Sequence, residues 1–130
     1  MSLGIVIVAH GRLAQEYLSA ADHVIGVNPK IKAISIYPSD NIYDKEKQIK
    51  MALTDVESGA GVIIVTDMHR STPANLALKA SKGCNCKVLF GVNLPLLVKL
   101  IKVRNLPASD AVDLALDAGK KYIKAANPIL

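Results

Sequence analysis

The chain has 130 residues, a length typical of one domain, so we expect a single domain over residues 1–130. Its 51% hydrophobic and 21% charged residues indicate a folded globular chain and exclude a disordered one. With no Trp, one Phe and four Tyr, it offers few rings on which nucleic-acid bases could stack, so we expect no nucleic-acid partner. The net charge of +5 is uneven. Residues 61–130 carry ten Lys and Arg against four Asp and Glu, which favours either an anionic partner or a solvated basic face.

The cysteines and the N-terminus indicate a reducing, cytoplasmic location. Cys84 and Cys86 are separated by one residue, which is too close for ordinary disulfide geometry. Two thiols also fall short of the four ligands of a structural zinc site, so we expect reduced thiols and no metal. The apolar segment from Met1 to Ala9 is too short for a membrane span and lacks the basic flank of a signal peptide.

The first half of the chain alternates strands with helices. Residues 4–9 form a continuous β-branched run, typical of a strand buried on both faces. Helical spacing of apolar residues follows over 12–25, and a second strand covers 31–36. Residues 39–41 can cap a helix that runs to about Val56. A third continuous strand is predicted over 61–67.

The second half continues the alternation. After a loop over 68–72, Thr72 is expected as the N-cap of a helix whose first residue is Pro73 and which runs to about Ser81. A short strand over 87–91, a helix over 94–103 and a long last helix over 109–125 complete the chain.

This order predicts an α/β three-layer sandwich around a mainly parallel sheet with strand order 2-1-3-4. In such folds ligands bind beyond the carboxyl ends of the strands, where the strand order reverses. For this order the reversal lies between the first and third strands, so reactive residues are expected at the ends of these two strands.

His10 follows the first strand and Asp67 follows the third, so both are expected to face the same crevice. A carboxylate that accepts a hydrogen bond from one imidazole nitrogen fixes the tautomer and leaves the other nitrogen free as a nucleophile. Gly11 permits an unusual backbone angle and the close approach of another group. His10 and Asp67 are the catalytic candidates.

An anion site is predicted beside them. The helix after Thr72 should direct free amides at the crevice, and Ser71 and Thr72 add hydroxyl groups. Arg70 and Arg12 add positive charge. Gly11, Arg70, Ser71 and Thr72 are the phosphate-binding candidates, and Arg12 and His69 the partner-binding ones. His69 is also a rival nucleophile, and a metal held by His10, His69 and Asp67 is an alternative that no ligand spacing supports.

Three segments carry a family resemblance: residues 5–11 (IVIVAHG), residues 65–67 with 71–75 (VTD and STPAN), and residues 91–97 (GVNLPLL). With them the chain resembles the mannose-type enzyme IIA components of the bacterial phosphoenolpyruvate-dependent phosphotransferase system, and its second half is most similar to short members linked to regulation. The resemblance implies phosphorylation of His10 by the histidine-containing phosphocarrier protein, with no cofactor. The phosphoryl group would then pass to a separate enzyme IIB or a regulatory protein. The chain itself would not insert into the membrane, but it could associate with a membrane permease complex.

The resemblance also implies a homodimer that exchanges an antiparallel C-terminal edge strand, for which residues 127–130 are short. Where the family usually has a glycine pair before Ser/Thr-Pro, this chain has Arg70 and Ser71, and His69 replaces an apolar or aromatic residue. Either the loop takes another shape with Arg70 supplying charge, or phosphoryl handling is weakened. Two alternative functions stay open: a regulatory, phosphorylation-dependent binding domain without onward transfer, and the phosphotransfer subunit of a dihydroxyacetone kinase.

Overall fold

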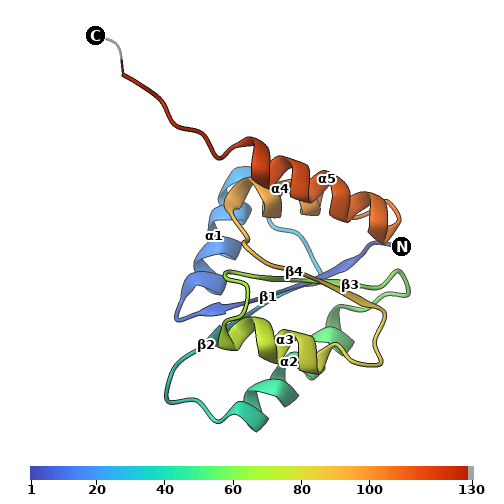
Figure 1. Cartoon of the computed structure of the whole chain (residues 1–130). Coiled ribbons are helices and arrows are strands. Elements are labelled where there is room, and N and C mark those ends of the chain that lie inside the picture. The colour runs from blue at the N-terminus through green and yellow to red at the C-terminus, as the bar shows by residue number, and fades with distance from the viewer. Residues whose placement is uncertain (129–130) are drawn as a thin grey trace.

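The computed structural model describes residues 1–128. Strands and helices alternate along most of the chain, as predicted (Figure 1). The elements are β1 (Gly4–His10), α1 (Leu13–Ile25), β2 (Ile31–Ile36), α2 (Ile42–Val56), β3 (Val62–Thr66), α3 (Thr72–Ala80), β4 (Cys86–Leu89), α4 (Leu94–Lys102) and α5 (Ala108–Lys121).

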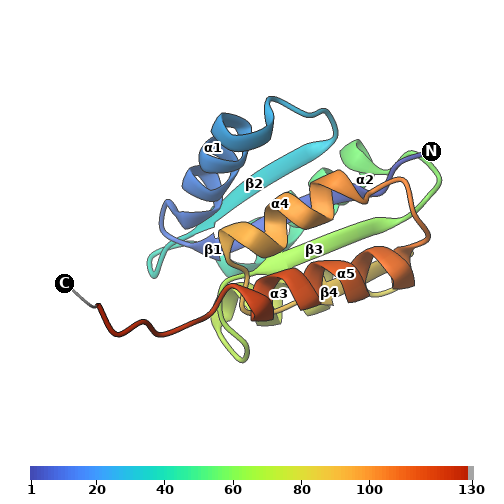
Figure 2. The same cartoon turned by 90° about the horizontal axis from the view of Figure 1, so that it is seen from above.

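The four strands form one parallel sheet in the order β2-β1-β3-β4, which confirms the predicted topology. Helices α1, α4 and α5 cover one face of the sheet and α2 and α3 cover the other (Figures 1 and 2). In β1 every residue from Gly4 to Ala9 is buried, because helices pack on both faces of a central strand.

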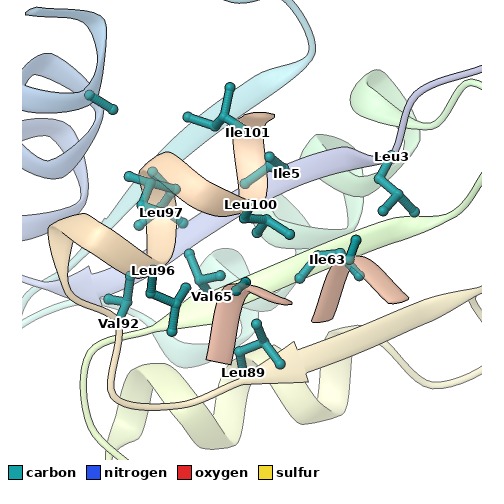
Figure 3. Close-up of a cluster of buried hydrophobic side chains, with 14 of the residues drawn as sticks. Leu3, Ile5, Ile63, Val65, Leu89, Val92, Leu96, Leu97, Leu100 and Ile101 are labelled. Carbon is teal, nitrogen blue, oxygen red and sulfur yellow. The ribbon is translucent and has the colours of Figure 1, made fainter. Parts of the chain in front are cut away.

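Two apolar clusters hold the layers together, one on each side of the sheet. On the α4 side, Ile5 and Ile7 of β1 pack with Leu97 and Leu100 (Figure 3). On the other side Val6 and Val8, the alternate residues of the same strand, pack against α2 and α3. Because successive side chains of β1 point to opposite faces of the sheet, this one strand contributes side chains to both clusters, as expected of a central strand.

Several element boundaries differ from the sequence prediction; for example, β3 spans Val62–Thr66 rather than residues 61–67, and β4 ends at Leu89 rather than residue 91. The N-cap of α3 is Ser71 and not Thr72, strand β4 begins at Cys86 rather than residue 87, and α5 ends at Lys121 rather than residue 125. The last helix stops early because its buried face ends at Gly119, while residues 120–128 are exposed and have no core to pack against.

Residues 123–128 form no strand and extend away from the body of the molecule (Figures 1 and 2). The predicted strand exchange requires a second copy of the chain and stays a prediction, and residues 129–130 of that segment lie outside the described residues. Within residues 1–128, no helix has both the length and the apolar character needed to cross a bilayer.

Candidate functional site

The side chains of His10 and Asp67 meet at the carboxyl edge of the sheet. His10 is the last residue of β1, and Asp67 directly follows the neighbouring parallel strand β3. Oδ2 of Asp67 lies 2.7 Å from Nδ1 of His10 and also accepts the backbone N–H of His10 at 3.0 Å. The His10 side chain is 47% exposed and that of Asp67 only 11%. The carboxylate therefore holds the imidazole by one nitrogen while the ring stays accessible from solvent.

The other oxygen of this carboxylate has no partner. Asp67 Oδ1 is buried and makes no hydrogen bond among the described residues. Because both hydrogen bonds from His10 converge on Oδ2, the two oxygens have different environments. An unpaired, buried carboxylate oxygen is costly, and a chemical role of the residue is one reason for which such a group is retained.

Gly11 makes the turn that leads away from His10. Its φ of +55° belongs to the left-handed region, and its N–H donates to the carbonyl of Ile36 at 2.9 Å. A Cβ at this position would meet nothing within 4 Å, so the expected close approach of another group is not present among the described residues. The glycine is needed here for its backbone angle and not for space.

The start of α3 lies beside this pair, but it has fewer free amides than the sequence suggested. The Ser71 hydroxyl accepts the N–H of Ala74 at 3.3 Å and donates to the carbonyl of Met68 at 2.6 Å. Pro73 has no N–H, and the N–H of Ala74 is bonded to Ser71. Among the first three residues of α3, only Thr72 therefore has a backbone N–H that is available to an anion. Ser71 is buried and Thr72 exposed, which leaves the Thr72 side chain as the accessible hydroxyl.

The loop before α3 keeps a glycine-like shape without a glycine. Arg70 has a φ of +65°, and Ser71 is extended with a φ of −93°. A left-handed conformation costs a non-glycine residue about 1–2 kcal/mol. Residue 70 therefore has a backbone angle that glycine adopts without strain. The loop adopts positive φ at an arginine, whose exposed side chain adds charge at the same position.

The two residues assigned to partner contacts are exposed and already have neighbours. Arg12 Nη2 lies 3.3 Å from Glu16 Oε1, in an ion pair whose side chains are both well exposed. The His69 ring packs against Phe90 with ring centroids 4.6 Å apart. No three His, Cys, Asp or Glu residues within 1–128 are grouped so as to hold a metal ion, and the alternative metal set is not assembled there.

A cavity of about 310 Å³ opens next to His10. Sequence reasoning missed three of its polar residues: Tyr37, Asp40 and Lys45. They lie in the segment after β2 and at the start of α2. Because β2 was predicted to lie next to β1, the segment that follows β2 could have been expected beside His10. The lining residues are His10, Ile36, Tyr37, Pro38, Asp40, Ile42, Lys45, Thr72 and Leu76.

Comparison with known proteins identifies the family. A model of the EIIA-man family, described as the PTS system fructose IIA component, matches residues 4–115. The chain belongs to the EIIA-man family. This membership confirms the resemblance drawn from the sequence segments.

Relatives and solved structures agree with this EIIA-man assignment. The mannose-specific EIIAB component of Escherichia coli (strain K12) is 28% identical over 96% of this chain, which spans 40% of that protein's length. EIIA from Streptococcus agalactiae superimposes with a TM-score of 0.85 at 23% identity, covering 95% of this chain and 96% of that one. The IIA protein associated with the fucose utilization operon of Streptococcus pneumoniae gives 0.82 at 25% identity, covering 95% and 93%.

Proposed function

We propose that this EIIA-man chain is a phosphohistidine carrier that accepts a phosphoryl group on Nε2 of His10 and passes it to another protein. The observation that carries the proposal is the 2.7 Å contact between Nδ1 of His10 and Oδ2 of Asp67. With Nδ1–H donating to the carboxylate, the lone pair of the neutral ring lies on Nε2. The accessible imidazole can then meet a phosphoryl group carried by a docking protein.

The chemistry requires little beyond this pair. The Nε2 lone pair attacks phosphorus, the N–P bond to His10 forms, and the bond to the leaving nitrogen of the donor breaks with its electron pair. No proton has to leave His10, because Nδ1–H stays bonded to Asp67 throughout. The carboxylate balances the positive charge that develops on the ring, and phosphoryl transfer depends mainly on such positioning and charge stabilisation.

Four neighbouring residues are proposed to stabilise the phosphoryl group. Arg70 supplies charge from a loop of positive φ, and the Thr72 hydroxyl and N–H lie at the start of α3 beside His10. Gly11 supplies the turn, and Ser71 acts through the loop, since its own hydroxyl is used within it. Arg12 and His69 are proposed to contact the docking protein.

The proposed donor is the histidine-containing phosphocarrier protein, charged by enzyme I from phosphoenolpyruvate, and the proposed acceptor is enzyme IIB or a regulatory protein. A homodimer in the cytoplasm, folded as a single domain over residues 1–130, belongs to the same proposal. These partners are the ones expected for the phosphotransferase component that the family model describes.

A regulatory domain without onward transfer is the second candidate. The observation that favours it is the start of α3, where Pro73 and the Ser71 cap leave few amides to stabilise a phosphoryl group. Under this alternative His10 is phosphorylated, and the modified surface binds a partner that never receives the phosphoryl group.

Incubation of the chain with phosphoenolpyruvate, enzyme I and the phosphocarrier protein tests the proposal. We expect an acid-labile mass gain of one phosphate that disappears in His10→Ala. Variants of the other two histidines of the chain, His23→Ala and His69→Ala, should still gain it. Absence of that gain in the native chain would overturn the proposal. Addition of an enzyme IIB separates the two candidates, because only a carrier loses its label to the acceptor.

A further inference from the structure

A further cavity lies at the opposite edge of the sheet from His10, where the strands begin. It has a volume of about 730 Å³, which gives room for a small molecule. Its walls come from the residues before β1, the turn between α1 and β2, the segment after α2 and the end of α4. Figure 2 shows these parts of the chain converging at one end of the sheet. We call this cavity the amino-edge cavity.

Three cationic side chains line the amino-edge cavity. Lys30 comes from the turn before β2, Lys102 is the last residue of α4, and Arg104 follows shortly after it. No Asp or Glu of the described part of the chain lines the cavity. None of the three cations forms an ion pair with a carboxylate within residues 1–128. The cavity therefore gathers positive charge that no neighbouring carboxylate balances.

Arg104 is the buried member of this set, with only 6% of its surface exposed. Its guanidinium donates to three acceptors, all of them backbone carbonyls, those of Leu3, Pro29 and Lys30. A guanidinium has five N–H donors, so two of them have no acceptor within residues 1–128. Carbonyl dipoles satisfy donors but do not neutralise a full charge, and a buried charge without a counter-ion is costly. An anion in the cavity would supply that counter-ion.

Two other residues of the cavity also have hydrogen-bond donors to spare. The side-chain oxygen of Asn105 accepts from the Ser2 hydroxyl at 2.6 Å, so the amide nitrogen of Asn105 still has its N–H groups to offer. Nζ of Lys30 donates one hydrogen bond to the carbonyl of Asp55 at 3.2 Å and keeps its other protons. The cavity thus offers a ligand both charge and donors, which is what phosphate and carboxylate groups require.

The helix ends at this edge of the sheet oppose an anion, but they do not outweigh the three cations. Helices α1, α2 and α4 all end beside the cavity, and the C-terminus of a helix is equivalent to about half a negative charge. The two carboxylates nearby are used elsewhere, since Asp55 lies 3.8 Å from Lys32 and Glu57 accepts the N–H groups of Gly59 and Gly61. The remaining field at the cavity is positive.

We propose that the amino-edge cavity binds a small molecule that carries two or more anionic groups, phosphate or carboxylate, held by Arg104, Lys30 and Lys102. More than one anionic group is specified because a single one would leave most of the cationic charge unbalanced. The cavity lies at the other end of β1 from His10. The inference therefore goes beyond the proposed function and does not rest on it.

Titration of the native chain with pyrophosphate and, separately, with citrate tests the proposal at constant ionic strength. In the ¹⁵N-labelled chain, the backbone amide signals and the Nε–H signal of Arg104 report binding. We expect saturating shifts at Lys30, Lys102 and Arg104 with at least one probe, and the probe that saturates at lower concentration identifies the preferred anionic group. No saturating shift at these residues with either probe would overturn the proposal.

A single substitution then tests the charge of the cavity without disturbing the buried arginine. The Lys102 side chain is exposed and forms no ion pair within residues 1–128, so Lys102→Gln should fold as the native chain does. We expect its dissociation constant for the stronger probe to rise about tenfold. The matched control is Lys121→Gln, which removes the same charge from an exposed position at the end of α5 and should bind within about twofold of the native chain. Equal affinities of the two variants would contradict the proposal.

A charge-preserving substitution separates the charge of Lys102 from its shape. Lys102→Arg keeps a cation and hydrogen-bond donors at the cavity, so its affinity for the probe should stay within about threefold of the native value. If Lys102→Arg loses as much affinity as Lys102→Gln, the lysine acts through packing, and its assignment as an anion-binding residue is wrong.

Discussion

Oδ2 of Asp67 accepts two hydrogen bonds from a single residue, His10, one from the ring at 2.7 Å and one from the backbone N–H at 3.0 Å. The double contact fixes the end of β1 to the end of β3 and sets the direction of the imidazole at the same time. A side chain that only capped a helix would not need both bonds to come from the same histidine. The arrangement is what a nucleophilic imidazole of defined tautomer requires.

The first prediction concerns that tautomer. In Asp67→Asn the amide can donate to Nδ1 and turn the ring into the tautomer whose Nε2 carries the proton and cannot attack. We expect the initial rate of His10 phosphorylation to fall at least about 100-fold. The rate is measured with labelled phosphoenolpyruvate, and the tautomer by ¹⁵N chemical shifts of the His10 ring.

Asp55→Asn is the control for this substitution, because Asp55 pairs with Lys32 in an exposed ion pair away from His10. It should leave the rate within twofold of the native chain. A native-like rate in Asp67→Asn would show that the carboxylate does not assist His10, whatever its distance from the ring.

The second prediction separates the shape of the loop from its charge at Arg70. Glycine and alanine both remove the charge, but glycine relieves the left-handed strain of the arginine whereas alanine keeps it. Arg70→Gly should therefore exceed Arg70→Ala in free energy of unfolding by about 1 kcal/mol. Urea denaturation measures the difference, and equal stabilities would mean that residue 70 is not held at positive φ in solution.

Phosphorylation rates of the same two variants show what the arginine contributes. If its charge stabilises the phosphoryl group, both variants lose rate equally. If the loop shape is the important feature, Arg70→Gly retains the rate that Arg70→Ala loses, because glycine alone keeps the backbone angle without cost.

The sheet order and the His10–Asp67 pair could be predicted from sequence because each depends on strong local signals. Continuous β-branched runs mark buried parallel strands, and the ends of neighbouring parallel strands meet at one edge. The cap of α3 could not be predicted as safely. Ser71 and Thr72 are both good capping residues, and the choice depends on whether the hydroxyl can reach both Met68 and Ala74, which is a matter of loop geometry.

Two further features depend on tertiary structure that no local pattern encodes. The positive φ of Arg70 is held by the loop around it, and arginine has no preference for that region. Lys45 lines the cavity beside His10 only because α2 packs back onto β1, placing a residue 35 positions later in the chain at the site. Its half-buried pair with Asp40 is visible only once that packing is known.

The third prediction concerns acid stability. Glu57 accepts the N–H groups of Gly59 at 2.6 Å and Gly61 at 2.9 Å, and these hydrogen bonds, the one from Gly61 foremost, lower the pKa of its carboxyl group. A lowered folded-state pKa gives stability that is present above the ordinary pKa of glutamate and is lost as the pH falls through the lowered value. Glu57→Gln should therefore be less stable than the native chain at pH 7, and the gap should close below about pH 4.

Because Glu57 is exposed, the gap at pH 7 should stay below about 1 kcal/mol. Denaturation of both proteins at pH 7 and pH 3 measures it. A gap that is the same at both pH values would show that the ionised carboxylate has no part in holding the turn.

The fourth prediction concerns the two thiols. Burial in the first place, and the neighbouring Cys84 in the second, raise the pKa of Cys86 to about 12. At pH 8 only about one Cys86 in ten thousand is then a thiolate, the form that reacts with alkylating agents. Cys84 is exposed, so iodoacetamide should modify the native chain once and at Cys84. Mass spectrometry of native chain and Cys84→Ser checks this, and rapid alkylation of the variant would contradict the raised pKa.

The last prediction concerns a buried arginine at the opposite end of the sheet from His10. Arg104 is only 6% exposed, and burial lowers its pKa. Its guanidinium donates to three carbonyls, those of Leu3 at 2.9 Å, Pro29 at 2.7 Å and Lys30 at 3.1 Å. These bonds tie the start of β1 to the turn before β2 and to the end of α4. The side chain therefore holds together three segments that are far apart in the sequence.

Arg104→Met should destabilise the fold by about 3 kcal/mol, because it removes three charge-assisted hydrogen bonds that join separate segments, while the methionine keeps most of the apolar contacts of the stem. Arg12→Met, at an exposed ion pair, should cost no more than about 0.5 kcal/mol. Urea denaturation at pH 7 compares the two variants. Equal and small losses would mean that water replaces the guanidinium at no cost, and that the carbonyls of Leu3, Pro29 and Lys30 do not depend on Arg104.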